Sequence, residues 1–202
     1  MQKKRVAILI SGRGSNMQSL IAAAEAPGFP AEIVLVFANK TDAAGLAFAA
    51  QHGIATKAVS HKGFASRDDF DAEIDKALEQ AGAEIVCLAG FMRILSEGFT
   101  RKWQGRMINI HPSLLPSFKG AHAHDLAIEA GVRISGCTVH FAVAELDSGP
   151  IIAQAAVPVE TGDTADTLAA RILVAEHRIY PEALSLLAAG KVRLEGSKAV
   201  FG

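Results

Sequence analysis

Two side chains suited to acyl-transfer chemistry lie two residues apart in the segment Asn109-Ile110-His111-Pro112-Ser113-Leu114-Leu115-Pro116. This segment follows a short apolar run at residues 106–108 that is typical of the end of a strand. Residues i and i+2 of a strand face the same side, so Asn109 and His111 should point the same way. The proline after His111 disfavours helical backbone at that histidine. An amide that polarises a carbonyl, beside an imidazole that moves a proton, indicates acyl or formyl transfer.

A carboxylate that can face His111 is Asp147, in the stretch Glu145-Leu146-Asp147-Ser148-Gly149. A carboxylate in that place would stabilise the protonated imidazole. Both features have a structural alternative, because Asn-x-His before proline also suits a turn with a hydrogen-bonded histidine, and Asp, Ser and Gly favour turns. For Asp147 the residues alone leave both interpretations open.

The loop Ser11-Gly12-Arg13-Gly14-Ser15-Asn16 joins the first predicted strand to the first predicted helix. Its two glycines let the backbone turn sharply, and free N–H groups at a helix N-terminus attract anions. We expect a phosphate here. Met17 replaces the third glycine of the dinucleotide fingerprint, and the Gly-Lys-Ser/Thr of a nucleoside triphosphatase is missing. The alternative is an ordinary turn in which Ser15 caps the helix.

Three further features of the sequence could bind a ligand or a metal: an apolar segment after a predicted strand, a pair of histidines, and two cysteines. The segment Gly90-Phe91-Met92-Arg93-Ile94-Leu95 could hold the flat faces of a heteroaromatic ligand, although alone it would be interpreted as core. His122-x-His124 lacks an identifiable third metal ligand, so we expect no metal. Cys87 and Cys137 lie in apolar segments and are expected to be core thiols.

Composition limits the partners. The 202 residues are 50% hydrophobic, with 20 basic and 21 acidic residues and no long block of like charge. This balance argues against nucleic acid and favours small-molecule substrates. No stretch reaches the roughly 18 apolar residues of a membrane span, and the apolar run at residues 6–10 is too short for a signal peptide. We therefore expect a cytoplasmic protein.

Short apolar runs alternate with helical patterns in the first half of the chain. Strands are predicted at 5–10, 32–38, 56–59 and 84–89, and helices at 16–24, 43–51 and 67–80. Ser66, three residues before Asp69, signals a helix start. This alternation indicates βαβ units and a mainly parallel sheet, whose ligands bind at the ends of the strands.

The pattern changes after His111. A helix at 125–130 precedes two β-like runs at 135–144 and 150–159, whose short connection favours antiparallel strands. A long helix at 164–188 follows, and the last dozen residues are expected to be loosely held. The fold predicted is α/β, a single-domain Rossmann-like open twisted sheet with a mainly parallel N-terminal half, antiparallel strands in the C-terminal half, and helices on both faces.

Four ordered motifs resemble one known family. The loop at residues 11–16, the segment 88–95, the octapeptide 109–116 and the stretch 145–150 together resemble the phosphoribosylglycinamide formyltransferase family of folate-dependent enzymes. The resemblance covers nearly the whole chain. It implies one formyltransferase domain over 1–202, with a nucleotide- and phosphate-binding half at 1–108 and a catalytic and folate-site half at 109–202. It departs from the family at Phe118-Lys119-Gly120-Ala121-His122, where relatives usually have proline before the glycine and a bulkier residue after it.

The resemblance also implies a reaction and its residues. The formyl group of 10-formyltetrahydrofolate, the co-substrate, would move to the amine of glycinamide ribonucleotide in purine biosynthesis, without a metal. Asn109, His111 and Asp147 match the family's catalytic residues. Glycinamide ribonucleotide would be held by Gly14, Ser15, Asn16 and Glu176. The folate would be held by Arg67, Met92, Arg93, Ile94, Leu95 and Asn109. We expect a monomer or a homodimer.

Two kinds of protein compete with this interpretation. A methionyl-tRNA formyltransferase or a formyltetrahydrofolate hydrolase shares the Asn-x-His motif, but each would carry an additional domain for which we expect no room in 202 residues. A non-catalytic or redox Rossmann-type nucleotide-binding protein is disfavoured by the missing third glycine and leaves Asn109, His111 and Asp147 unexplained.

Overall fold

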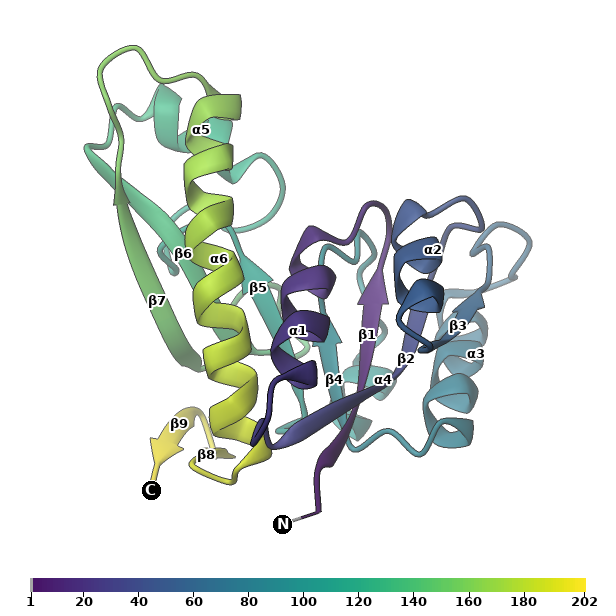
Figure 1. The fold of residues 1–202 in the computed structure, drawn as a ribbon. Coiled ribbons are helices and arrows are strands. Elements are labelled where there is room, and N and C mark those ends of the chain that lie inside the picture. Colours follow the sequence, from purple (N-terminus) through teal and green to yellow (C-terminus); the bar gives the residue numbers. More distant parts are fainter. Residues whose placement is uncertain (1) are drawn as a thin grey trace.

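A seven-stranded sheet with the order β3-β2-β1-β4-β5-β6-β7 forms the centre of the computed structural model, which describes residues 2–202. The strands from β3 to β5 are parallel, whereas β6 pairs antiparallel with both β5 and β7. The sheet is drawn in Figure 1. Its strands are β1 (Lys4–Ile10), β2 (Ala31–Ala38), β3 (Ala55–Ala58), β4 (Ile85–Leu88), β5 (Met107–His111), β6 (Ile134–Phe141) and β7 (Ile151–Pro158).

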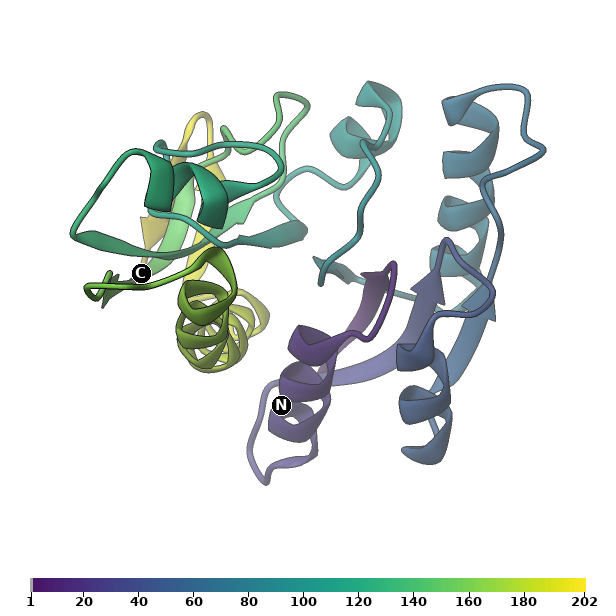
Figure 2. The ribbon, with the colours of Figure 1, turned by 90° about the horizontal axis from the view of Figure 1, so that it is seen from above.

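Helices cover both faces of this sheet, as Figure 2 shows from above. One face carries α1 (Ser15–Glu25), α2 (Ala44–Gln51) and the long α6 (Ala165–Ala188). The other face carries α3 (Arg67–Gln80) and the short α4 (Glu97–Lys102). Helix α5 (Ala123–Glu129) lies between the loop after β5 and the start of β6. The predicted single α/β domain with a mixed sheet is therefore confirmed.

The apolar strands divide their side chains between two cores. Val6, Ile8 and Ile10 pack in the cluster beneath α1 and α6, while Ala7 and Leu9 pack in the cluster beneath α3. Successive side chains of a strand point to opposite faces, so a strand buried on both sides must be apolar throughout. This requirement explains why the run at residues 6–10 contains no polar residue.

A buried hydroxyl attaches α6 to the sheet. Tyr180, which is fully buried, shares its hydroxyl proton between the carbonyl oxygens of Leu88 and Ile108 at 3.0 and 3.1 Å. These carbonyls belong to the neighbouring strands β4 and β5. Because Tyr180 and Glu176 are four residues apart on one helix, they share a face. The contact therefore also sets the position of Glu176 relative to the sheet.

The predicted elements agree with the observed ones to within a few residues, and two regions differ. Helix α4 had no sequence-based prediction. The last dozen residues were expected to be loosely held, and that expectation is wrong, because they form a hairpin of β8 (Val192–Glu195) and β9 (Lys198–Phe201). Val192 is buried against the core, which explains why the hairpin is ordered.

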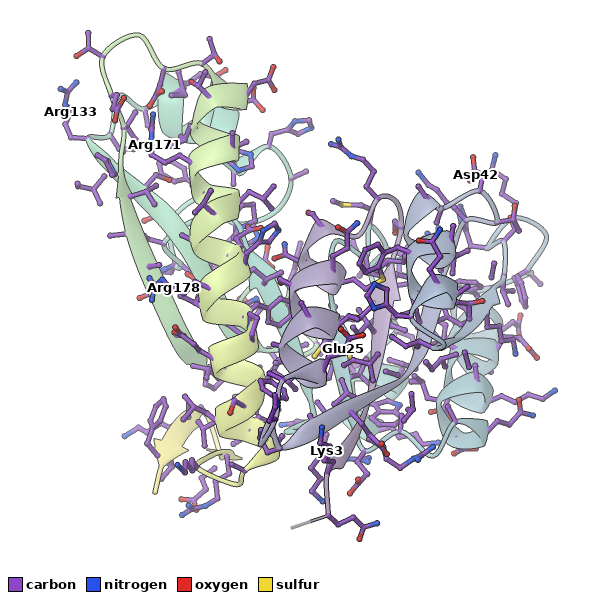
Figure 3. All side chains as sticks on the ribbon, viewed as in Figure 1. Lys3, Glu25, Asp42, Arg133, Arg171 and Arg178 are labelled. Atoms are coloured by element: carbon purple, nitrogen blue, oxygen red, sulfur yellow. The ribbon has the colours of Figure 1, made fainter. Side chains whose placement is uncertain are left out.

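Charged side chains lie mainly on the outside of the molecule. Figure 3 labels several of them, among them Lys3, Glu25, Asp42 and Arg133, all of which are exposed. Within residues 2–202, the helices include none that combines the length and the apolar character needed to span a membrane.

The connection between β6 and β7 leaves no room for a side chain at Gly149. A Cβ atom there would lie 1.7 Å from the carbonyl oxygen of Phe141. Gly149→Ala should therefore push the connection away from β6 and destabilise the protein by about 1–3 kcal/mol, as overpacking does. Urea unfolding followed by circular dichroism measures this change in the free energy of unfolding.

Gly98→Ala is the matched control, because a Cβ at Gly98 would meet no atom within 4 Å and the residue lies in helix α4. It should leave stability unchanged or raise it by up to about 1 kcal/mol, since alanine favours helix. Equal effects of the two substitutions would contradict the close contact at Gly149.

Candidate active site

Asn109 and His111 lie on β5, where the sheet changes from parallel to antiparallel pairing. Their neighbours Ile108 and Ile110 point into the core beneath α1 and α6. Asn109 and His111 consequently face the opposite side of the sheet, with Met107, which packs in the second core. Asn109 and His111 thus share one face of the sheet, as their i, i+2 spacing predicts.

Asp147 reaches this face from the connection between β6 and β7. Its Oδ2 lies 3.4 Å from His111 Nδ1, and both side chains are at most 6% exposed. The backbone N–H of Gly120 donates to the same Oδ2 at 2.8 Å. The backbone of Asp147 is left-handed, with a φ of 50°, a conformation that aspartate adopts more readily than most other residues with a side chain. The connection therefore holds the carboxylate against the histidine.

Both ring nitrogens of His111 face oxygen acceptors. Nδ1 faces Asp147, and Nε2 lies 2.8 Å from the carbonyl oxygen of Phe118. Phe118 also has positive φ, 54°, in the loop that follows β5. His111 is 5% exposed, and the Phe118 loop, residues 112–122, contacts it through the Phe118 carbonyl.

A pocket opens beside Asn109 and Asp147. The segment after β4 supplies one wall, on which Ile94 is 56% exposed. The pocket is lined by Leu88, Arg93, Ile94, Leu95, Thr100, Met107, Asn109, His140, Ala142, Val143, Ala144, Leu146 and Asp147. Arg93 also stacks on Phe70, with its guanidinium carbon 5.6 Å from the ring centre. The structure thus brings Arg93, Ile94 and Leu95 together with Asn109, and exposed Arg67 begins helix α3 outside this lining.

The loop after β1 forms a second pocket. Gly14 is the N-cap of α1 with φ 69°, and among the described residues no side chain caps this helix. The predicted alternative in which Ser15 caps the turn is therefore wrong, and Ser15 is instead the first helical residue. The first N–H groups of this helix therefore have no side-chain acceptor and remain available as donors. Met92 lies between the two regions, because it lines this pocket and its N–H donates to Ser11 Oγ at 2.7 Å.

Glu176 reaches the same loop from α6. Its Oε2 accepts a hydrogen bond from Asn16 Nδ2 at 2.7 Å, and the two side chains are 160 residues apart in sequence. Burial raises the pKa of Glu176, and the bond from Asn16 partly opposes this effect. Among residues 2–202, Asn16 Oδ1 is one of few buried polar atoms with no hydrogen-bond partner. Beside the glycine loop, the Asn16 and Glu176 pair therefore retains a buried acceptor that can still receive a hydrogen bond.

Two residues of this region were not singled out as site residues from the sequence. Lys40 lines the glycine-loop pocket and brings a cation close to the proposed anion site. It follows β2, whose carboxyl end adjoins that of β1, so topology rather than local sequence would have identified it. His140 lines the first pocket opposite Asn109.

His122 pairs with a neighbouring carboxylate, and the two cysteines lie in the core. His122 Nδ1 lies 3.6 Å from Asp125 at the start of α5. Within the described part of the chain, no cluster of three or more His, Cys, Asp or Glu side chains is arranged to hold a metal ion. Cys87 and Cys137 are free and buried, as expected, and burial raises the pKa of each thiol to about 12.

Known proteins are similar to this chain over most of its length. Residues 4–184 match the family described as formyl transferase. Phosphoribosylglycinamide formyltransferase of Escherichia coli is 44% identical over 96% of this chain and 92% of its own length. The trifunctional purine biosynthetic protein adenosine-3 of Gallus gallus is 54% identical over 95% of this chain, which spans only 19% of that relative. The first curated relatives are thus about five times longer than the part matched.

Solved structures give the same result. Glycinamide ribonucleotide transformylase 1 from Symbiobacterium toebii superimposes with a TM-score of 0.96 at 42% identity, covering 98% of this chain and 94% of that one. A formyltetrahydrofolate deformylase from Pseudomonas syringae shares the fold at 28% identity, with a TM-score of 0.92 over 99% of this chain and 66% of that one. The matched residues, the fold and the identity over nearly full-length relatives show that the chain belongs to the formyl transferase family.

Proposed function

We propose that this chain transfers the formyl group of 10-formyltetrahydrofolate to the amine of 5-phosphoribosylglycinamide. The products would be N-formylglycinamide ribonucleotide and tetrahydrofolate, a step of de novo purine biosynthesis. One observation carries the proposal: Asn109, Asp147 and His111 converge beside a pocket lined by Arg93, and the preceding residue, Met92, lines the pocket of the uncapped glycine loop. A transferase needs such an arrangement, because donor and acceptor must meet at one carbon.

The phosphoribosyl substrate would occupy the glycine-loop side. Its phosphate would bind the N–H groups of Gly14, Ser15 and Asn16, with Lys40 adding charge. Glu176 would accept hydrogen bonds from the ribose hydroxyls, whose approach would satisfy the buried polar atoms of the Asn16 and Glu176 pair. The substrate amine would then extend past Met92 toward Asn109.

The folate would occupy the first pocket. Its pterin would lie against Arg93, Ile94 and Leu95, with backbone groups of residues 92–95 pairing with the polar ring atoms. Exposed Arg67, which lies three residues from Phe70 in α3, would reach the acidic tail of the folate. Because Asn109 lines this pocket too, it would contact the formyl group at the boundary between the substrates.

Attack of the amine nitrogen on the formyl carbon would place negative charge on the formyl oxygen. An N–H of Asn109 would stabilise that charge more in the transition state than in the ground state. The bond between the carbon and N10 would then break, with N10 receiving a proton through His111 as the amine loses one. No covalent enzyme intermediate and no metal are required.

For this step, the Phe118 loop must give up its hydrogen bond with His111. The Nε2–H of His111 donates to the Phe118 carbonyl in this structure, and the same N–H would serve the substrate. We infer that the bound substrate displaces that carbonyl while Asp147 holds the opposite nitrogen. We place the reaction in the cytoplasm and assign it to a monomer or a homodimer.

The rival functions have less support. The deformylase structure is 28% identical to this chain, against 42% for the glycinamide ribonucleotide transformylase from Symbiobacterium toebii. An uncapped anion site beside the catalytic residues also favours a phosphorylated acceptor over water. A nucleotide-binding protein without catalysis would not need Asp147 buried against His111.

The function is tested by mixing the protein with glycinamide ribonucleotide and 10-formyltetrahydrofolate and following tetrahydrofolate release. Asn109→Ala and His111→Ala should each reduce turnover on the order of 10²- to 10³-fold, the effect of losing an oxyanion donor. Both variants should keep the circular dichroism spectrum of the parent. His52→Ala, which removes a histidine paired with Glu25 on the surface, should retain full activity. Absence of release by the parent protein would refute the function.

The phosphate site is tested first by removing the phosphate from the substrate. Glycinamide riboside lacks the phosphate, so its kcat/KM should fall by at least about 100-fold, the effect of losing roughly 3 kcal/mol of charged hydrogen bonds. Gly14→Ala, which strains a left-handed residue, should affect the ribonucleotide but scarcely change the poor rate with the riboside. Equal use of both substrates would show that no phosphate binds there.

Glu176→Gln should raise the stability of the protein while weakening its binding of the ribonucleotide. Because burial raises the pKa of Glu176 in the folded state, its charge weakens folding once the pH exceeds the ordinary pKa of the carboxyl. The neutral variant should therefore have the higher Tm at neutral pH, with the gain vanishing in acid. At the same time KM for the ribonucleotide should rise about 10-fold, the effect of roughly 1.4 kcal/mol of lost binding. A lower Tm at neutral pH would contradict this account.

A further inference from the structure

His140 is a buried polar residue of the active site to which the proposed mechanism gives no role. It lies directly opposite Asn109 in the antiparallel pairing of β5 and β6 and is 2% exposed. The register of β6 against β7 shifts between Val139 and His140, an irregularity of the kind that changes the direction of a side chain. The imidazole lines the same pocket as Asn109 and Asp147.

The contacts of His140 determine which nitrogen carries its proton. Nδ1 lies 2.9 Å from the carbonyl oxygen of Phe141, which can only accept, so Nδ1 must be the donor. Burial lowers the pKa of His140, an effect that exceeds the opposing effects of the Phe141 carbonyl and of Asp147, and the charge of His111 lowers it further. The ring is therefore neutral, and Nε2 carries a lone pair.

That lone pair fixes the orientation of Asn109. Nε2 lies 3.3 Å from the Nδ2 atom of Asn109 and can only accept. The amide must then turn its NH₂ group toward His140. One N–H is held by the imidazole and the second remains for a ligand of the pocket. The opposite orientation would present the Asn109 carbonyl oxygen to a developing negative charge and repel it.

We propose that His140 is a positioning residue, whose Nδ1–H form accepts a hydrogen bond from Asn109 and so directs the remaining amide N–H at the formyl oxygen. The inference rests on the proposed function and adds a residue to it. The role of Nε2 as an acceptor from Asn109 is supported by the position of Asp147, whose Oδ1 lies 3.8 Å from Nε2, beyond hydrogen-bond distance. A protonated His140 would have no lone pair at Nε2, and Asn109 would lose its acceptor.

Two amide substitutions of different length test this role. In His140→Gln, the side-chain oxygen can occupy the place of Nε2 and accept from Asn109. In His140→Asn, the shorter amide can reach the Phe141 carbonyl but leaves Asn109 without an acceptor. We expect kcat to fall on the order of 10- to 100-fold in the asparagine variant, less than the loss of the donor itself, with KM for both substrates within about threefold. The glutamine variant should recover most of kcat.

The pH profile and a double substitution distinguish positioning from a general structural role. Activity that falls in acid through protonation of His140 should persist to lower pH in His140→Gln, because glutamine does not titrate. In an Asn109→Ala background, His140→Asn should change kcat by less than about twofold, since the group it positions is gone. Equal kcat in the two amide variants, or losses that multiply in the double variant, would overturn the proposal.

A spectroscopic measurement decides the orientation without reference to activity. Two-bond ¹H–¹⁵N correlation spectra of uniformly labelled protein, with His140→Gln used to assign the signal, should show a neutral Nδ1–H ring at neutral pH. An Nε2–H form or a charged ring would refute the inference even in a fully active enzyme. A parent protein that shows the expected ring but releases no tetrahydrofolate would instead refute the proposed function.

Discussion

The reversal of strand direction at β5 is the constraint on which the site depends. β5 is parallel to β4 on one side and antiparallel to β6 on the other. Antiparallel pairing sets residues directly opposite each other, and it is this pairing that places His140 across from Asn109. β6 also pairs antiparallel with β7, and the short connection between these two strands brings Asp147 onto the histidine of β5.

Much of this arrangement follows from local sequence patterns. Continuous apolar runs predict the buried strands, and their alternation with helical patterns predicts the parallel part of the sheet. Ser66 caps α3 as expected by accepting a hydrogen bond from the Asp69 N–H. The i, i+2 spacing of Asn109 and His111 was enough to predict their common face.

Other features could not be obtained from local pattern. Helix α4 has only six residues, too few to show a clear period, and its N-cap is Ser96, whose backbone N–H donates to Asp71 of α3. The terminal hairpin is ordered by burial of Val192, a contact invisible in its own sequence. The roles of Lys40 and His140 depend on which strands are neighbours, and the Phe118 contact depends on a loop with positive φ.

The hydroxyl of Tyr180 has a consequence for how the molecule can move. Sliding α6 along the sheet would break a fully buried contact with two strands at once, so the helix is fixed relative to β4 and β5. The connections after β5 and β6 contact each other through the Gly120 N–H and Asp147, and the first of them contacts the sheet through the Phe118 carbonyl and His111. Any movement of these connections would therefore take place against a helix that keeps its position relative to β4 and β5.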